Sequence, residues 1–151
     1  MSGMFLVGLL DDLFGFTPFI KLLLQFVPAV AMSFAGSILS PLSIWIFIPL
    51  MFWFVFFTNA LNYTDNANGL CAGLVLILTT GVAMTAQLGH DPGFALFAGA
   101  VTGFLFLNFP EGRVFLGDSG SHLLGVILSI LILGVVQTGQ RVRQSNNEAP
   151  K

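Results

Sequence analysis

Long apolar runs alternate with short polar segments along the chain. Reading the runs between Pro, Gly and polar clusters predicts five membrane-spanning helices. They cover roughly Lys21 to Gly36, Pro41 to Leu61, Leu70 to Leu88, Phe94 to Phe109, and Ser121 to Thr138. The first and fourth are short for a bilayer core of about 30 Å, so we expect them to extend into the loops or to line the bundle interior. The apolar start of the chain, which stops at two aspartates, resembles the end of a further span.

Composition supports this prediction. Hydrophobic residues make up 56% of the chain, charged residues only 8%, and the mean hydropathy is +0.92, values that cannot cover a water-facing surface. We predict an all-α, polytopic transmembrane helical bundle with about five full spans plus the end of one N-terminal span. Residues 1–138 would form this core, and the polar residues 139–151 would be a disordered tail. The single cysteine, Cys71, is expected to pack between helices.

The polar segments fall into two groups. Residues 11–21, 59–69 and 108–122 are dense in acids, amides and glycines, whereas 37–41, 88–93 and the tail are short or bland. Because two predicted spans separate each dense segment from the next, all three dense segments should lie on one side of the membrane. Five of the seven acids then converge there. They are Asp11, Asp12, Asp65, Glu111 and Asp118.

Such a cluster needs a cation, because carboxylates near the membrane interior are costly and usually functional. Carboxylate and amide oxygens are the hard ligands that Mg²⁺ prefers, together with waters and substrate phosphates. Simpler explanations stay open for each segment. Asp11 and Asp12 also fit a solvated helix end, and Asp118 fits a helix N-cap. A capped turn would explain the acid and the three amides of the second segment. These are Asn59, Asn62, Asp65 and Asn68.

Three motifs together resemble the polyprenyl-phosphate N-acetylhexosamine-1-phosphate transferases of glycosyltransferase family 4. The motifs are GLLDDLFGFTPFIKLLLQ (8–25), NALNYTDNANGLCAG (59–73) and FLNFPEGRVFLGDSGSHLLG (106–125). They stand in the family order, separated by the expected pairs of spans, and the resemblance covers residues 8 to about 138. The compact stretch between the aspartate pair and KLLLQ is closer to the GlcNAc-1-phosphate branch than to the MurNAc-pentapeptide branch.

The resemblance implies a reaction. Members transfer a sugar 1-phosphate from a UDP-sugar to polyprenyl phosphate, release UMP and depend on Mg²⁺, with Mn²⁺ as a substitute. The resemblance places the chain in the bacterial inner membrane with its active face cytoplasmic. It implies a role in cell-wall biogenesis, in the synthesis of lipid-linked cell-envelope glycans such as lipopolysaccharide or teichoic acid. UDP-sugar and polyprenyl phosphate are then its partners. The scattered Lys and Arg and the net charge of −2 argue against nucleic acid.

The same resemblance suggests roles for individual residues. Asp118 would be the principal metal ligand and Asn62 a second one. Asp11 and Asp12 would serve the lipid-phosphate nucleophile or the metal, a division that the resemblance leaves open. The other matched positions would contact the nucleotide or a phosphate, although Lys21 also fits a snorkelling interfacial lysine. These positions are Asp65, Asn68, Phe115 and Lys21.

The chain also departs from the family pattern. Asn66 and Ala67 stand where many members have Gly and an apolar residue. We expect the chain to lack N-terminal and C-terminal spans of the family and a histidine-rich loop. His90 falls on the opposite face and His122 belongs to another motif, so neither replaces that loop by position. An inactive fragment or truncated homologue is therefore one alternative, and a minimal enzyme completed as a homodimer is another.

Intramembrane proteolysis is a remote alternative. GDSG (117–120) fits the GxSG pattern of intramembrane serine proteases, with Ser119 as the nucleophile. A serine nucleophile needs a base, yet His122 follows only three residues later and His90 is placed across the membrane. The aspartyl-protease alternative is weaker still, because Phe115 stands where such proteases have Gly.

Overall fold

Six helices make up the computed structural model, which describes residues 1–39, 44–86 and 92–148. Within this part of the chain there is no strand. The structure therefore confirms the predicted all-α bundle. The helices are α1 (Ser2–Phe14), α2 (Pro18–Leu39), α3 (Ile44–Thr64), α4 (Leu70–Ala86), α5 (Pro92–Asn108) and α6 (Gly117–Glu148).

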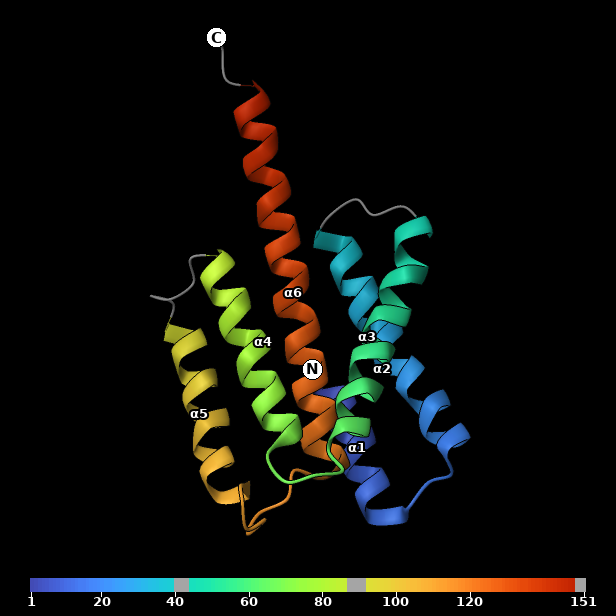
Figure 1. The fold of residues 1–151 in the computed structure, drawn as a ribbon. Helices are drawn as coiled ribbons and strands as arrows, with labels where there is room; N and C mark the ends of the chain where they lie inside the picture. Colours follow the sequence, from blue (N-terminus) through green and yellow to red (C-terminus); the bar gives the residue numbers. More distant parts are fainter. Residues whose placement is uncertain (40–43, 87–91, 149–151) are drawn as a thin grey trace.

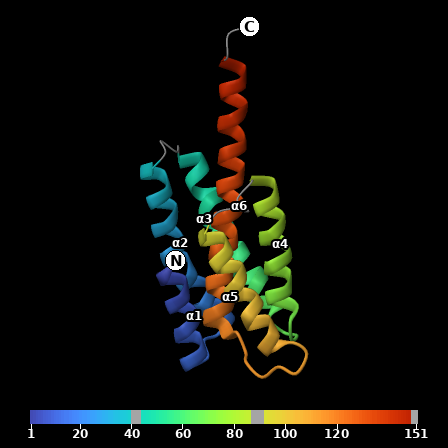
Figure 2. The same ribbon diagram turned by 90° about the vertical axis from the view of Figure 1, so that its left-hand side faces the viewer.

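Helix α6 is the central element of the bundle. It packs against α1, α3 and α4, whereas α2 packs on α1 and α3, and α5 packs on α4 at the periphery (Figures 1 and 2). Glycines allow the closest approaches. A Cβ atom added to Gly8 of α1 would lie 2.4 Å from the Asp118 carbonyl oxygen, and one added to Gly125 would lie 2.7 Å from Cα of Thr58. The backbone of α6 therefore touches the backbones of α1 and α3.

All three dense polar segments lie at the same end of the bundle. The turns after α1, α3 and α5 gather at the lower end in Figure 1, where α6 begins. Helix α1 stops at Gly15, whose left-handed φ of 63° lets its N–H donate to the Asp11 carbonyl. The even number of predicted spans between successive segments thus correctly predicted that these segments meet. The compartment that they face stays a prediction.

The helix boundaries agree with the predicted spans to within a few residues, except in α6. Among the described residues, three helices are long and apolar enough to cross a bilayer by length and composition, over Pro18–Ala35, Trp45–Thr64 and Gly117–Gln137. Helices α4 and α5 have 17 residues each, or about 25 Å at 1.5 Å per residue. The ends of the second and third predicted spans at Pro41 and Leu88 lie outside the described residues.

The prediction of a disordered tail differs from the structure. Helix α6 continues to Glu148, ten residues past the predicted boundary at residue 138. Polarity favoured disorder, but residues 140–148 contain no Gly or Pro, and Gln, Arg and Glu are good helix formers. Tail residues 149–151 lie outside the described part of the chain.

Candidate active site

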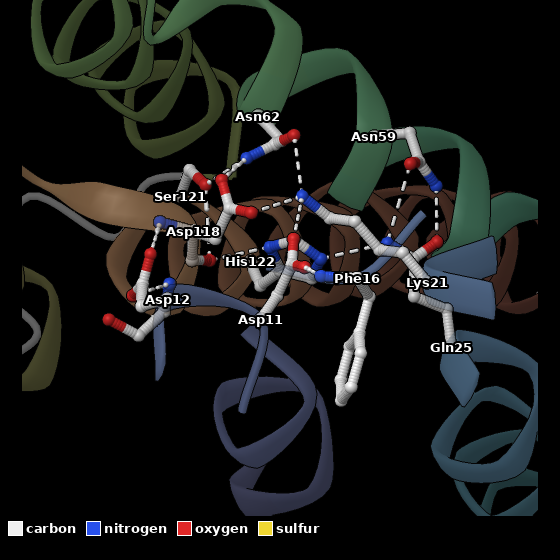
Figure 3. Close-up of polar contacts among 11 residues, drawn as sticks. Asp11, Asp12, Phe16, Lys21, Gln25, Asn59, Asn62, Asp118, Ser121 and His122 are labelled. Atoms are coloured by element: carbon white, nitrogen blue, oxygen red, sulfur yellow. Dashed lines mark hydrogen bonds and ion pairs between the residues drawn. The ribbon is translucent and has the colours of Figure 1, made fainter. Parts of the chain in front are cut away.

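The polar ends of four helices meet around the side chain of Lys21. Its Nζ atom lies 2.9 Å from Oδ2 of Asp11 and 3.1 Å from Oδ1 of Asn62, and it also donates to Oδ2 of Asp118 (Figure 3). The Lys21 side chain is only 13% exposed. An ammonium so far removed from water needs such acceptors. Lys21 therefore points into the acidic cluster and does not extend along the surface as a snorkelling lysine would.

Local structure explains why these side chains converge. Asp11 and Asn62 lie in the last turns of α1 and α3, whereas Lys21 and Asp118 lie in the first turns of α2 and α6. Asn62 links α3 to the first turn of α6. Its Nδ2 atom donates to Oδ1 of Asp118 at 2.5 Å and to Oγ of Ser121 at 3.0 Å. Helix ends from distant parts of the sequence thus form one site.

The two adjacent aspartates have different partners. Asp11 is buried, pairs with Lys21 and accepts a hydrogen bond from the Phe16 N–H at 2.7 Å. Asp12 accepts hydrogen bonds from the backbone N–H groups of Asp118 and Ser119, one on each carboxylate oxygen, at 2.8 and 2.9 Å. Asp12 therefore caps the N-terminus of α6 from another helix, where a negative charge also suits the helix dipole.

Asp65 adds a further carboxylate next to this site. It follows the last residue of α3 and is partly buried. Burial raises the pKa of the Asp65 carboxyl above its ordinary value, and the negative charges of Asp118 and Asp12 raise it further. The Gly117 N–H opposes this shift by hydrogen bonding. The raised pKa therefore reflects first the burial of the Asp65 carboxyl and then its closeness to other carboxylates.

Three other predicted residues lie in the loops, outside the hydrogen-bonded cluster around Lys21. Asn68 donates to the Pro110 carbonyl at 3.1 Å and braces the loop before α6. Phe115 is 73% exposed, so its ring is free to meet a ligand. Glu111 pairs with Arg113 at the surface, with 2.5 Å between Oε2 and the Nη2 atom.

Comparison with known proteins identifies the family. The family model described as glycosyl transferase family 4 matches residues 1–136. The chain belongs to this family. Sequence reasoning from the three motifs is therefore confirmed at the level of the family.

Several curated members of glycosyl transferase family 4 are similar to the chain. It is 34% identical over 149 residues to the phospho-N-acetylmuramoyl-pentapeptide-transferase of Leuconostoc citreum, a match of 86% of this chain and 46% of that protein. It is also 34% identical over 142 residues to the probable undecaprenyl-phosphate N-acetylglucosaminyl 1-phosphate transferase of Bacillus subtilis, covering 84% and 40%.

A third relative is the undecaprenyl-phosphate alpha-N-acetylglucosaminyl 1-phosphate transferase of Thermotoga maritima, 38% identical over 128 residues and covering 83% of this chain and 40% of that protein. The chain thus spans less than half the length of these curated relatives. Both branches match it at similar identity, so its closeness to the GlcNAc branch stays a prediction.

The donor atoms of this family 4 chain fit a divalent cation with few protein ligands. In the described residues no group of three His, Cys, Asp or Glu side chains is placed to hold a metal ion. Mg²⁺ does not require one, since it commonly takes one or two carboxylates plus waters and substrate phosphates. The Asp118 carboxylate and the Asn62 amide supply oxygen atoms of the kind that Mg²⁺ prefers, and both contact the positive charge of Lys21.

Sequence reasoning missed several residues that the structure connects to the site. Asn59 was grouped with the other polar residues of its segment, as a capped turn or part of a site, without a role of its own. His122 was weighed only as a loop histidine or as a base for Ser119, and Gln25 was given no role. Gln25 hydrogen-bonds to both Asn59 and His122 beside Lys21 (Figure 3). Asn108 was inside a dense segment without a role. Its side chain joins the Gly69 N–H to the Val114 carbonyl and so ties two loops together.

The geometry gives no support to the serine-protease alternative. The Nδ1 atom of His122 contacts the Asp118 carbonyl, and its Nε2 atom contacts Gln25. Both ring nitrogens are therefore engaged, and neither is available as a base for Ser119.

Proposed function

We propose that the chain carries the phosphoryl-transfer site of a Mg²⁺-dependent membrane enzyme. This site moves N-acetylhexosamine 1-phosphate from a UDP-sugar to polyprenyl phosphate and releases UMP. The observation that carries the proposal is the convergence of Asp11, Lys21, Asn62 and Asp118 from four helices at one end of an apolar bundle. An anionic site with one enclosed ammonium suits two phosphate-bearing substrates and a divalent cation.

In the proposed reaction an oxygen of the lipid phosphate attacks the phosphorus that bears the sugar. The bond from that phosphorus to the UMP oxygen breaks, and UMP leaves with the electron pair. The three N–H groups of the Lys21 ammonium now donate to Asp11, Asn62 and Asp118. Lys21 would hold a phosphate oxygen once a divalent ion takes the oxygens of Asp118 and Asn62 and so releases two of these donors. Asp11 positions that ammonium, and Asp12 serves the reaction indirectly by holding the start of α6.

Asp118 and Asn62 are the residues that would hold the divalent ion, Mg²⁺ or Mn²⁺. When bound, the ion neutralises charge that develops on the phosphate oxygens. The carboxylates of Asp11 and Asp118 both face the single ammonium of Lys21, which supports the need for a cation beside Asp118. Asp65, Asn68 and the exposed ring of Phe115 would form the nucleotide side of the site.

The position of the site at a bundle end supports access from two phases. The lipid substrate would enter laterally from the bilayer, and the nucleotide would enter from the aqueous side. The relatives' names place undecaprenyl phosphate among their substrates. By analogy we place this chain in the bacterial inner membrane, with the site on the cytoplasmic face.

The test is UMP release by purified protein in nanodiscs with undecaprenyl phosphate, Mg²⁺ and UDP-GlcNAc. UDP-MurNAc-pentapeptide as a second donor distinguishes the two branches. Turnover should fall at least about 100-fold in Asp118→Ala, as expected for loss of a main electrostatic group. Glu111→Gln, which changes only a surface ion pair, is the matched control. No turnover from folded wild-type protein, alone or as a dimer, would favour the inactive-fragment alternative.

A further inference from the structure

A second layer of polar side chains lies beside the Lys21 cluster, one helical turn deeper in the bundle (Figure 3). It consists of Gln25, Asn59 and His122. Each is three or four residues from a member of the Lys21 cluster on the same helix, so the second layer and the cluster are one helical turn apart. The neighbours along each helix are Lys21 and Gln25 on α2, Asn62 and Asn59 on α3, and Asp118 and His122 on α6.

This second layer is buried, and hydrogen bonds connect its three side chains. Gln25 and His122 are both 0% exposed. The Nε2 atom of Gln25 lies 2.8 Å from Nε2 of His122 and 3.3 Å from Oδ1 of Asn59. The Nδ2 atom of Asn59 donates back to Oε1 of Gln25. Both N–H groups of the Gln25 amide thus have an acceptor, as a buried amide requires.

Two backbone carbonyls fix the direction of every hydrogen bond in the layer. The Val55 carbonyl accepts from Nδ2 of Asn59 at 2.8 Å, and the Asp118 carbonyl contacts Nδ1 of His122. A carbonyl cannot donate, so Nδ1 carries the proton and Nε2 of the neutral ring accepts from Gln25. Turning either amide around would place like groups against each other. The chain of bonds therefore has one satisfied arrangement.

We propose that Gln25, Asn59 and His122 are positioning residues that hold α2, α3 and α6 in the register at which Lys21, Asn62 and Asp118 meet. This inference rests on the proposed function for its consequence in catalysis. Its physical reason is that a directional, fully satisfied buried network admits one relative rotation of the three helices, whereas apolar packing alone tolerates several. Outer groups of this kind orient the groups that contact a metal or substrate.

The competing explanation is that the layer only holds the helices together. A double variant separates the two explanations. Replacing one partner leaves a buried polar group unpaired, whereas replacing both partners by apolar groups of similar shape can be nearly neutral for stability. Gln25→Leu with His122→Leu should therefore regain part of the thermal stability that Gln25→Leu alone loses, because His122 no longer stands unpaired and Asn59 keeps its bond to the Val55 carbonyl. A positioning role predicts that the site stays impaired although the fold recovers.

The first measurement is Mn²⁺ binding by full-length protein in nanodiscs, followed by electron paramagnetic resonance. We expect the double variant to bind Mn²⁺ about 10- to 100-fold more weakly than the wild type, the usual effect of losing an outer group. His122→Gln should retain most of the affinity, because a glutamine supplies one donor and one acceptor. Ser129→Ala is the matched control, since it removes a buried hydroxyl of the same helix that bonds only to Val126. UMP release, where the wild type turns over, should follow the same order.

The second measurement does not depend on metal or turnover. The chain contains two lysines, Lys21 and Lys151, so ¹⁵N-lysine NMR with Lys151→Arg assigns the Lys21 ammonium. Its signal should be slow to exchange in the wild type and in Ser129→Ala, and exchange should be at least about tenfold faster in the double variant because the acceptors shift. If the wild type binds no Mn²⁺ but this change occurs, the proposed function fails and the positioning inference stands. An unchanged Lys21 signal in a double variant that folds would overturn the inference.

Discussion

Asp11 and Asp12 are neighbours in the sequence, but their carboxylates face different partners. Asp11 turns toward Lys21, and Asp12 turns toward the first amides of α6. One aspartate therefore neutralises a charge, and the other closes a helix end. This division assigns separate consequences to two substitutions that look equivalent in the sequence.

Asp12→Ala should lower the free energy of unfolding by about 1–2 kcal/mol, the usual effect of losing a helix cap. Asp12→Asn keeps one acceptor oxygen and should lose less. Thermal unfolding in detergent measures both. Glu111→Gln is the control, because its exposed pair with Arg113 should contribute less than about 1 kcal/mol. If Asp12→Ala unfolds at the wild-type temperature, the cap contributes nothing.

Lys21→Met should be more severe, because it leaves Asp11 and Asp118 facing each other without a counter-charge. We expect a loss of about 3 kcal/mol, the low end for breaking a buried ion pair, since Asp118 is 29% exposed. Mg²⁺ should raise the unfolding temperature of Lys21→Met more than that of the wild type, because a divalent ion replaces the missing charge. Equal shifts in both proteins would contradict this account. Lys21→Arg, which keeps the charge, is the control.

The sequence predicted which acids gather at the site but not the different partners of Asp11 and Asp12. Spacing and parity were sufficient to bring Asp11, Asp65 and Asp118 to one end, because apolar runs determine how often the chain crosses the bundle. The cap by Asp12 could not be predicted, since it depends on the position of α6, 106 residues away along the chain. Lys21 had two equally good interpretations until the distance to Asp11 separated them.

At the scale of helices, the site depends on how closely α1 approaches α6. Gly8 lies at this contact, one turn before Asp12, and the backbone at Asp118 and Ser119 occupies the space that a side chain would need. The same contact brings the Asp12 carboxylate within reach of the α6 amides. The close packing of α1 against α6 therefore also determines the geometry of the site.

Gly8→Ala should destabilise the bundle by about 1–3 kcal/mol, because backbone atoms at 2.4 to 2.7 Å cannot yield as a flexible side chain would. It should also lower UMP release by moving Asp118. Gly99→Ala is the matched control, since a Cβ atom there meets nothing within 4 Å and alanine favours the helix. Thermal unfolding and turnover are measured on both variants. Loss of stability in Gly99→Ala equal to that in Gly8→Ala would show that the close contact is unimportant.

Apolar periodicity predicted the helices themselves better than their ends. The first turns of α2 and α6 begin at Pro18 and Gly117, before the predicted starts at Lys21 and Ser121. In both cases the functional residue lies in the added turn or at its edge, where polar groups interrupt the apolar run. Hydropathy underestimates the length of a helix at such positions, because a charged residue lowers the hydropathy as a loop residue would. The tail was missed for the same reason.

For the whole molecule, the decisive property is that three turns share one end of the bundle (Figure 1). We predict that Thr17→Cys, Asn66→Cys and Glu111→Cys, each introduced into a Cys71→Ala background, react with a membrane-impermeant maleimide from the cytoplasmic side only. All three positions are exposed. Gly93→Cys, exposed at the start of α5 at the opposite end, should react from the other side.

The four variants are labelled in sealed inside-out vesicles and in spheroplasts. An even number of crossings between successive turns requires the first three to label together, because helices cannot end inside the hydrocarbon with unpaired backbone groups. Helices α4 and α5 are the critical pair, since each is about 25 Å long and depends on local thinning of the bilayer to cross. If Glu111→Cys labels from the side opposite to Thr17→Cys, α4 and α5 do not both cross, and the acids and loops could not serve one membrane face.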